Sequence, residues 1–319
     1  MTPRLPIVLL LAIAAAAASF TTTSAASPAP APTPTQESPM TSFAYDQVPT
    51  QFVEAGGVRF AYRRFGAAAG VPLVWLNRFR GTIDHWDPAL LEVVARERPV
   101  IVFDNAGVGA SSGSVAPDIA GAARDAAAFI DALRLEQVDL LGWSMGGTIA
   151  QRLALDRPGL VRRIVLAGTG PGGVPEAPRT PEKVWQVAAK AVNDDEDFLY
   201  LFFADTPTSR AAGLASLRRL DRRLATSRAS VSPESWKVQA GAIAAWAAGK
   251  DSAYARLAEI RAPALVANGA NDVMIHAYHS YAMSQRLPHA QLLLYPDAGH
   301  GFLFQYPDHF GRQVNEFLR

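Results

Sequence analysis

Cysteine is absent from this chain of 319 residues. Its absence excludes a disulfide framework, a lipid-modified N-terminal cysteine and every zinc site that depends on thiolate ligands. The P-loop pattern of nucleotide-binding proteins is missing as well, because no G-x-x-x-x-G-K-[ST] occurs. We therefore expect neither a metal ion nor a cofactor.

An excess of charge of either sign is also lacking. Lysine and arginine number 30, aspartate and glutamate 29, and the formal net charge at pH 7 is +1. Nothing in this balance indicates a nucleic acid or an anionic surface as a partner. Hydrophobic residues make up 49% of the chain, and a folded part of about 280 residues can bury a core that holds without disulfides.

Residues 1–26 are typical of a secretory signal peptide. Arg4 supplies a positive charge, and residues 5–18 form an apolar run that is short for a membrane span. Small residues follow, and cleavage after Ala25 or Ala26 would suit a signal peptidase. An uncleaved anchor is the alternative. We predict a secreted or periplasmic protein with no stable membrane anchor after cleavage.

Residues 27–42 form a proline-rich linker in this interpretation. Proline alternates with small residues in SPAPAPTPT. Such a sequence favours extended polyproline II structure and cannot build a core. It would act as a semi-rigid spacer before the folded part.

From residue 43 onward, apolar runs of strand length alternate with segments of helical spacing. Gly56-Gly57 separates two such runs and predicts a hairpin. Continuous apolar runs are typical of buried strands, and capping residues and prolines mark helix starts. The predicted strands are 51–66 (two strands), 71–76, 100–104, 138–142, 162–168, 262–268 and 290–295, and the predicted helices are 87–97, 118–133, 146–157, 275–287 and 305–318.

This alternation predicts an α/β fold with a mostly parallel central sheet and helices on both faces. Between residues 171 and 249 the pattern is mostly helical, with Thr180 and Ser232 as expected N-caps before prolines. We interpret 43–170 and 250–319 as the core and 171–249 as a helical cap or lid. Ligands of such sheets bind at the carboxyl ends of the strands, and the candidate site is expected there.

The stretch Gly142-Trp143-Ser144-Met145-Gly146 matches G-x-S-x-G between a predicted strand and a predicted helix. A glycine-rich turn whose serine merely caps the helix is the alternative. In the strand–turn–helix context, the motif instead favours a nucleophile, because the sharp turn projects the Ser144 hydroxyl above the sheet. The backbone N–H of Met145 and the positive helix start point at the same space.

Serine needs a base and an orienting acid. His300 follows the last predicted strand between two glycines, and Asp272 follows the strand before it. The order Ser144, Asp272, His300 is the one given for this architecture. Asp297 is a weaker candidate acid because it shares the loop of His300. Among the other histidines, we interpret His276 and His279 as a solvated helix face, and His85, His289 and His309 as structural or surface residues.

The chain resembles the α/β-hydrolase fold superfamily from about residue 51 to residue 318. FDNAGVGASSG (103–113) is similar to the D-x-x-G-x-G-x-S loop of that family, and GWSMGG resembles the nucleophile elbow of its esterase, lactonase and perhydrolase branches. The resemblance implies that Ser144 is the nucleophile, His300 the base and Asp272 the orienting carboxylate. It also implies an oxyanion hole from the backbone N–H groups of Phe79 and Met145.

One loop departs from the family pattern, because Asn77-Arg78 stands where His-Gly is usual. We expect Arg78 and Arg80 to pair with acidic side chains such as Asp84 or Asp104. The alternative is that Arg80 meets an anionic or carbonyl-rich substrate. The aromatic residues near the motif are more often core than pocket, and Trp143 and Arg80 are kept as candidate substrate-binding residues.

The arginines 218, 219, 222 and 223 are interpreted as a solvated helix face. The predicted function is that of an exported serine hydrolase that cleaves a small carboxylic ester or lactone through an acyl-enzyme. Perhydrolysis or peptide cleavage on the same residues is the alternative, and a non-catalytic ligand-binding module is a third hypothesis. Neither the actual substrate nor the oligomeric state follows from the sequence.

Overall fold

The computed structural model describes residues 45–225, 227 and 230–319. The predicted signal peptide (1–26) and linker (27–42) lie outside the described residues. All that follows concerns one unit of the chain, Phe43–Arg319. In this part of the chain no helix combines the length and the apolar character needed to cross a membrane.

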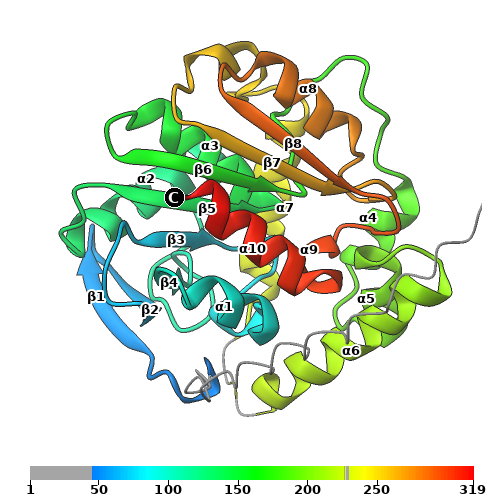
Figure 1. Cartoon of the computed structure of the whole chain (residues 1–319), viewed down its shortest axis with the longest axis horizontal. Coiled ribbons are helices and arrows are strands. Elements are labelled where there is room, and N and C mark those ends of the chain that lie inside the picture. The colour runs from blue at the N-terminus through cyan, green and yellow to red at the C-terminus, as the bar shows by residue number, and fades with distance from the viewer. Residues whose placement is uncertain (1–44, 226, 228–229) are drawn as a thin grey trace, which may run out of the picture. The chain divides into compact units, whose positions relative to one another are not determined.

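Eight strands form one sheet in the order β1-β2-β4-β3-β5-β6-β7-β8 (Figure 1). The strands are β1 (Gln51–Ala55), β2 (Val58–Gly66), β3 (Leu73–Leu76), β4 (Pro99–Phe103), β5 (Val138–Trp143), β6 (Val161–Ala167), β7 (Ala264–Gly269) and β8 (Ala290–Tyr295). β2 runs antiparallel to both of its neighbours, and all other pairs are parallel. The expected α/β fold with a mostly parallel sheet is confirmed.

Helices cover both faces of the sheet, which explains why β3, β4, β5 and β7 are buried along their whole length. The helices of the α/β part are α1 (Pro88–Ala95), α2 (Ile119–Ala132), α3 (Met145–Asp156), α8 (Tyr278–Arg286), α9 (Phe302–Gln305) and α10 (Pro307–Phe317). One core cluster contains residues of α1, α9 and α10, and a second contains residues of α2, α3 and α8 (Figure 1).

Three 3₁₀ turns and four further helices complete the described part of the chain. The turns are η1 (Tyr45–Gln47), η2 (Ile83–His85) and η3 (Tyr254–Glu259), and the helices between β6 and β7 are α4 (Glu182–Ala188), α5 (Asp195–Phe202), α6 (Pro207–Leu224) and α7 (Pro233–Ala247). Ser232 caps α7 as expected, its side chain accepting from the backbone of Ser235. The expected cap at Thr180 is wrong, because its hydroxyl donates to the carbonyl of Met274 and α4 has no side-chain cap.

Helix α6 is fastened to the start of α1 by buried ion pairs. Arg219 donates two hydrogen bonds, of 2.7 and 2.6 Å, to the carboxylate of Asp87, which also caps α1. Arg223 donates to Asp84 at 2.7 Å. The expectation of a solvated basic face is therefore wrong for these two arginines, because each faces a buried acid, whereas Arg218 and Arg222 are exposed.

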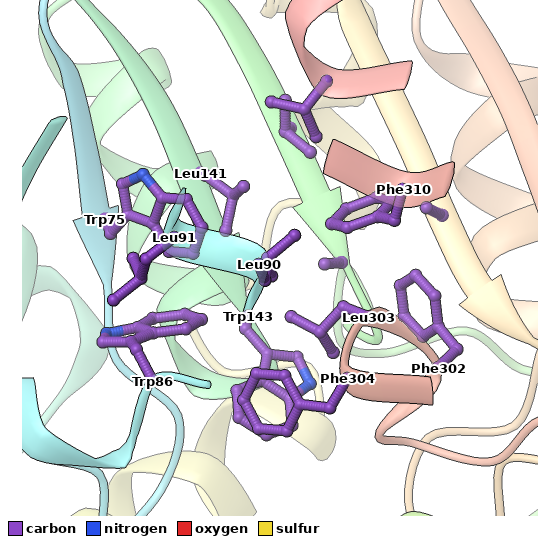
Figure 2. Close-up of a cluster of buried hydrophobic side chains, with 14 of the residues drawn as sticks. Trp75, Trp86, Leu90, Leu91, Leu141, Trp143, Phe302, Leu303, Phe304 and Phe310 are labelled. Carbon is purple, nitrogen blue, oxygen red and sulfur yellow. The ribbon is translucent and has the colours of Figure 1, made fainter. Parts of the chain in front are cut away.

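Large aromatic side chains fill the core beneath the site. Figure 2 shows Trp143 beside Phe304, with Trp86 and Leu90 of neighbouring segments close by. The ring centres of Trp143 and Phe304 are 4.8 Å apart in an edge-to-face arrangement, and those of Trp143 and Trp86 are 5.7 Å apart. The end of β5 is thus held rigidly by apolar packing.

Candidate active site

Ser144 lies at the turn between β5 and α3 in a backbone conformation that L-residues rarely adopt, with φ 57° and ψ −119°. Its amide donates to the carbonyl of Ala167 on β6, and its carbonyl accepts from the Thr169 hydroxyl. These two hydrogen bonds fix the turn from the neighbouring strand. Strain of this kind persists only where the surroundings enforce it, and it concentrates at functional sites.

Glycines on both sides of the serine are required by close approach. A Cβ on Gly142 would overlap the carbonyl of Gly146, and one on Gly146 would overlap the carbonyl of Leu76 on β3. A Cβ on Gly147 would overlap the side chain of Thr169. Glycine at positions 142, 146 and 147 therefore lets β3, β5, α3 and the segment after β6 approach this closely.

Asp272 and His300, which are 28 residues apart, lie in direct contact. The Nδ1 atom of His300 is 2.7 Å from Oδ2 of Asp272, and both side chains are almost completely buried. The other oxygen of Asp272 accepts from the backbone N–H groups of Met274 and Ile275. This loop around the carboxylate explains why α8 begins at Tyr278 and not at the expected residue 275. The Asp272 contact places the ring proton of His300 on Nδ1 and leaves Nε2 as the basic nitrogen.

The basic nitrogen of His300 has no hydrogen-bond partner among the described residues. His300 and Ser144 line the same cavity, which has a volume of about 480 Å³. Contacts between a nucleophile and its base are often long in the unliganded state and shorten when substrate binds. The predicted alternative acid Asp297 does not contact His300 and accepts instead from the hydroxyl of Thr206.

Trp143 does not line the cavity, contrary to its expected place among substrate-binding residues. Its side chain is 1% exposed and its indole N–H donates to the backbone carbonyl of His300 at 3.1 Å. The ring of His300 also packs against Gly168, at which a Cβ would lie 3.2 Å from Nδ1. Trp143 and Gly168 thus position His300 from two sides.

The loop after β3 turns sharply at Arg78-Phe79-Arg80-Gly81. The N–H of Gly81 donates to the carbonyl of Arg78, and Arg80 has a positive φ of 55°. Such a four-residue turn uses the carbonyl of its first residue and the N–H of its last. The N–H of Phe79 therefore lies outside that hydrogen bond, and Phe79 lines the cavity together with Ser144. The N–H of Met145, as the first of α3, has no carbonyl acceptor within the helix.

Asn77, which stands in the place of the usual histidine, has a structural role. Its amide nitrogen donates to the carbonyl of Phe103 at the end of β4, and its amide oxygen accepts from the indole of Trp86 at 2.6 Å. Asn77 is 2% exposed. It ties β3, β4 and the segment before α1 together, which a glycine-rich loop would not do.

The expected pairing of Arg78 and Arg80 with Asp84 or Asp104 is wrong. Asp84 instead pairs with Arg63 and Arg223, and Asp104 accepts from two backbone N–H groups. The Arg80 guanidinium donates to three backbone carbonyls, those of residues 188, 190 and 191. Within the described residues, the Arg78 side chain donates to the carbonyl of Phe79 alone.

These features are those of a known family, and its sequence model, described as the alpha/beta hydrolase fold, matches residues 71–307. The chain belongs to this family. A solved alpha/beta hydrolase fold protein from Chitinophaga pinensis is 38% identical with a TM-score of 0.79, over 86% of this chain and 98% of that one.

Two curated proteins illustrate how varied the relatives of this hydrolase are. A poly(3-hydroxyalkanoate) depolymerase of Ectopseudomonas oleovorans is 29% identical over 255 residues, which is 78% of this chain and 84% of the relative. A dihydrolipoyllysine-residue acetyltransferase component of an acetoin cleaving system, from Cupriavidus necator, is 29% identical over 84% of this chain and 68% of the relative.

The D-x-x-G-x-G-x-S loop of the hydrolase supports the site by binding the segment that follows β3. The buried carboxylate of Asp104 accepts from the backbone of Ile83, in the segment after β3, and from that of Ala110. Burial raises the pKa of Asp104 to about 6. The Ser111 hydroxyl donates to the Asp104 carbonyl. The motif therefore holds the two loops that flank the site in register.

His85 was expected to be structural or at the surface, but it lines the cavity of the hydrolase. The N–H of Thr82 donates to Nδ1 of His85, so the ring proton lies on Nε2. Burial, and then the nearby charge of Arg78, lowers the pKa of His85 to about 3. His85 is therefore a neutral side chain with a hydrogen-bond donor. The spacing of Thr82 and His85, T-x-x-H, was the signal in the sequence that could have indicated this contact.

The remaining cavity wall comes from the helices between β6 and β7. Apolar side chains of α5 and α6, such as Phe198, Leu201 and Leu220, lie opposite the serine. The expected solvated pair His276 and His279 lies elsewhere, and His279 packs against Gly170 with its pKa lowered by burial. Within the described ranges, no three His, Asp or Glu side chains form a group suited to a metal ion.

Proposed function

We propose that this α/β hydrolase is a serine hydrolase that cleaves a carboxylic ester or lactone through an acyl-enzyme. The observation that carries the proposal is the cavity that Ser144 and His300 share, with Asp272 in contact with His300. A strained serine, a histidine with a free basic nitrogen and a buried carboxylate behind it are the parts that activate a hydroxyl nucleophile.

In this mechanism Nε2 of His300 accepts the proton as the Ser144 hydroxyl attacks the substrate carbonyl. The backbone N–H groups of Phe79 and Met145 stabilise the negative charge that develops on the carbonyl oxygen. His300 then gives the proton to the leaving alcohol, activates water, and the acyl-enzyme is hydrolysed. Asp272 holds the imidazole tautomer and stabilises the imidazolium in both halves of the reaction.

Ester or lactone substrates are supported by the apolar cavity wall and by a relative whose name indicates a polyester, the poly(3-hydroxyalkanoate) depolymerase. An aspartate at the elbow is the nucleophile for haloalkane or epoxide substrates within this fold, and this chain has serine there. A small-molecule ester of moderate length fits a volume of about 480 Å³.

The test is Ser144→Ala assayed on a chain-length series of aryl esters and a few lactones. We expect turnover to fall at least about 10³-fold, because the nucleophile is lost while the fold remains. Ser284→Ala, on α8, is the matched control and should keep full activity. A fluorophosphonate should label the wild type and not Ser144→Ala. Turnover by Ser144→Ala near the wild-type rate would refute the proposal.

We also propose that the protein is exported. The support is the composition of residues 1–26, with Arg4, the apolar run 5–18 and small residues before Ala26. N-terminal sequencing of the protein from its own host should begin after Ala25 or Ala26. A mature protein that begins at Met1 and stays with the cytoplasmic fraction would contradict export.

A further inference from the structure

Arg78 is a cation in the wall of the cavity, and no acidic partner for it is found in the part of the chain that the structure describes. Its guanidinium carbon lies 5.1 Å from the ring centre of Phe202 and 5.6 Å from that of Trp143. One N–H donates to the carbonyl of Phe79, and the Nε atom is buried with no hydrogen-bond partner among the described residues. A guanidinium has several more N–H groups, and they remain for a ligand.

The buried arginines among the described residues, unlike the half-buried Arg78, are matched by carboxylates. Arg63 donates to Asp84 at 2.7 Å, and Arg98 lies 3.9 Å from Asp139 and donates to the Asn315 side chain at 2.7 Å. No Asp or Glu of the described residues comes within 4 Å of the Arg78 side chain. Burial, with the charge of Arg80, lowers the pKa of Arg78 to about 10, so the group remains charged at neutral pH.

A charge that is partly withdrawn from water without a counter-ion lowers stability, and in the wall of a cavity such a group can pair with a ligand of opposite charge. Arg80 also lines the cavity, but its guanidinium is already bonded to three carbonyls and its carbon lies 5.2 Å from the ring centre of Trp236. The acids that border the cavity, Asp194, Asp195 and Asp221, are exposed. They face solvent and do not neutralise Arg78.

We propose that Arg78 binds a carboxylate on the substrate, so that the enzyme prefers esters or lactones with a free acid group near the scissile carbonyl. This inference rests on the proposed function of Ser144. The acid group is expected close to the reacting carbonyl because Arg78 directly precedes Phe79, whose N–H is assigned to the oxyanion hole. The neutral His85 supplies a second hydrogen-bond donor in the same cavity.

The test compares charged esters with uncharged analogues of the same length. Monomethyl glutarate is paired with methyl 5-oxohexanoate, and monomethyl adipate with methyl 6-oxoheptanoate, with hydrolysis followed by proton release. A hydrogen-bonded charge pair predicts a kcat/KM that is about 10- to 100-fold higher for the acid. Arg78→Gln should lose this preference, and Arg78→Lys should keep part of it. Arg218→Gln, at the exposed surface, is the control.

Binding without turnover separates this inference from the proposed function. Glutarate should bind to Ser144→Ala in calorimetry, and the added change Arg78→Gln should abolish binding. Arg78→Gln alone should unfold at the same temperature as the wild type or higher, because a half-buried charge without a counter-ion is removed. If the role of Arg78 were purely structural, the substitution would lower the unfolding temperature.

Equal kcat/KM values for both esters of each pair, or glutarate binding that survives Arg78→Gln, would overturn the assignment of Arg78. Esterase activity that depends on Ser144 would stand in that case. Conversely, turnover by Ser144→Ala would refute the nucleophile while leaving the glutarate result intact.

Discussion

At the scale of single residues, the site depends on side chains that hold others in place. Asp272 fixes the tautomer of His300, Trp143 binds its backbone carbonyl, and Asn77 anchors the loop that carries Phe79. None of these three needs to touch substrate. Preorganisation of this kind keeps the reacting groups in position at no cost during the reaction.

His85 gives a pH-dependent prediction. Its pKa is about 3 in the folded protein and about 6.5 when unfolded. The unfolded chain therefore binds more protons between these values, and His85 lowers stability as the pH falls below about 6.5. The contribution of His85 to the free energy of unfolding falls by up to about 1.4 kcal/mol per pH unit.

Urea unfolding of the wild type and of His85→Asn at pH 7, 6 and 5 checks this. The stability of the wild type relative to His85→Asn should decrease with each step toward acid. A difference between wild type and His85→Asn that stays constant across these pH values would contradict the prediction.

At the scale of elements, α6 is joined to α1 by charge. The Asp87 carboxylate is completely buried and accepts from Arg219, from the Ser216 hydroxyl and from the backbone of Ala89. Helix α6, whose side chains line the cavity, is thus fixed to Asp87, the residue that caps α1. Removing one partner of a buried pair costs far more than the pair contributes in net stability.

Arg219→Ala is therefore expected to lower the free energy of unfolding by about 3 kcal/mol. Arg222→Ala, three positions along the same helix, should change it by less than about 0.5 kcal/mol because Arg222 is exposed. Urea titrations of both variants measure the difference. Equal changes in the free energy of unfolding for the two substitutions would show that the ion pair to Asp87 contributes no more to stability than an exposed arginine does.

The sequence predicted the elements of the sheet well because their signals are local. Buried strands appear as apolar runs, and G-x-S-x-G, Asp272 and His300 each follow one directly. Contacts between distant segments have no such signal. The Arg219–Asp87 pair spans 132 residues, and the partners of Asn77 lie on two other segments. Arg78 and Arg80 were predicted to pair with Asp84 or Asp104 because these acids are close in sequence. Closeness in sequence does not determine which side chains meet in the fold.

At the scale of the whole molecule, residues Phe43–Arg319 form one compact unit of the chain. A chain that begins at Phe43 should therefore have the same midpoint of thermal unfolding and the same kcat/KM as a chain that begins at Ser27. Reductant should change neither value, because the chain contains no cysteine. Calorimetry and an ester assay on both forms test this, and a loss of several degrees on truncation would assign residues 27–42 a structural role.

The segment between β6 and β7 is fixed to the rest of the described chain at several places, among them the Arg219–Asp87 pair on α6 and the bonds of the Arg80 guanidinium to residues 188–191. Because contacts hold this segment on both sides, it does not move away from the cavity as one rigid body. The entrance to the cavity would then keep a nearly constant width, and substrates would be selected by their cross-section. Bulky acyl branches should be rejected abruptly, whereas slender chains of increasing length should be accepted until the interior is full.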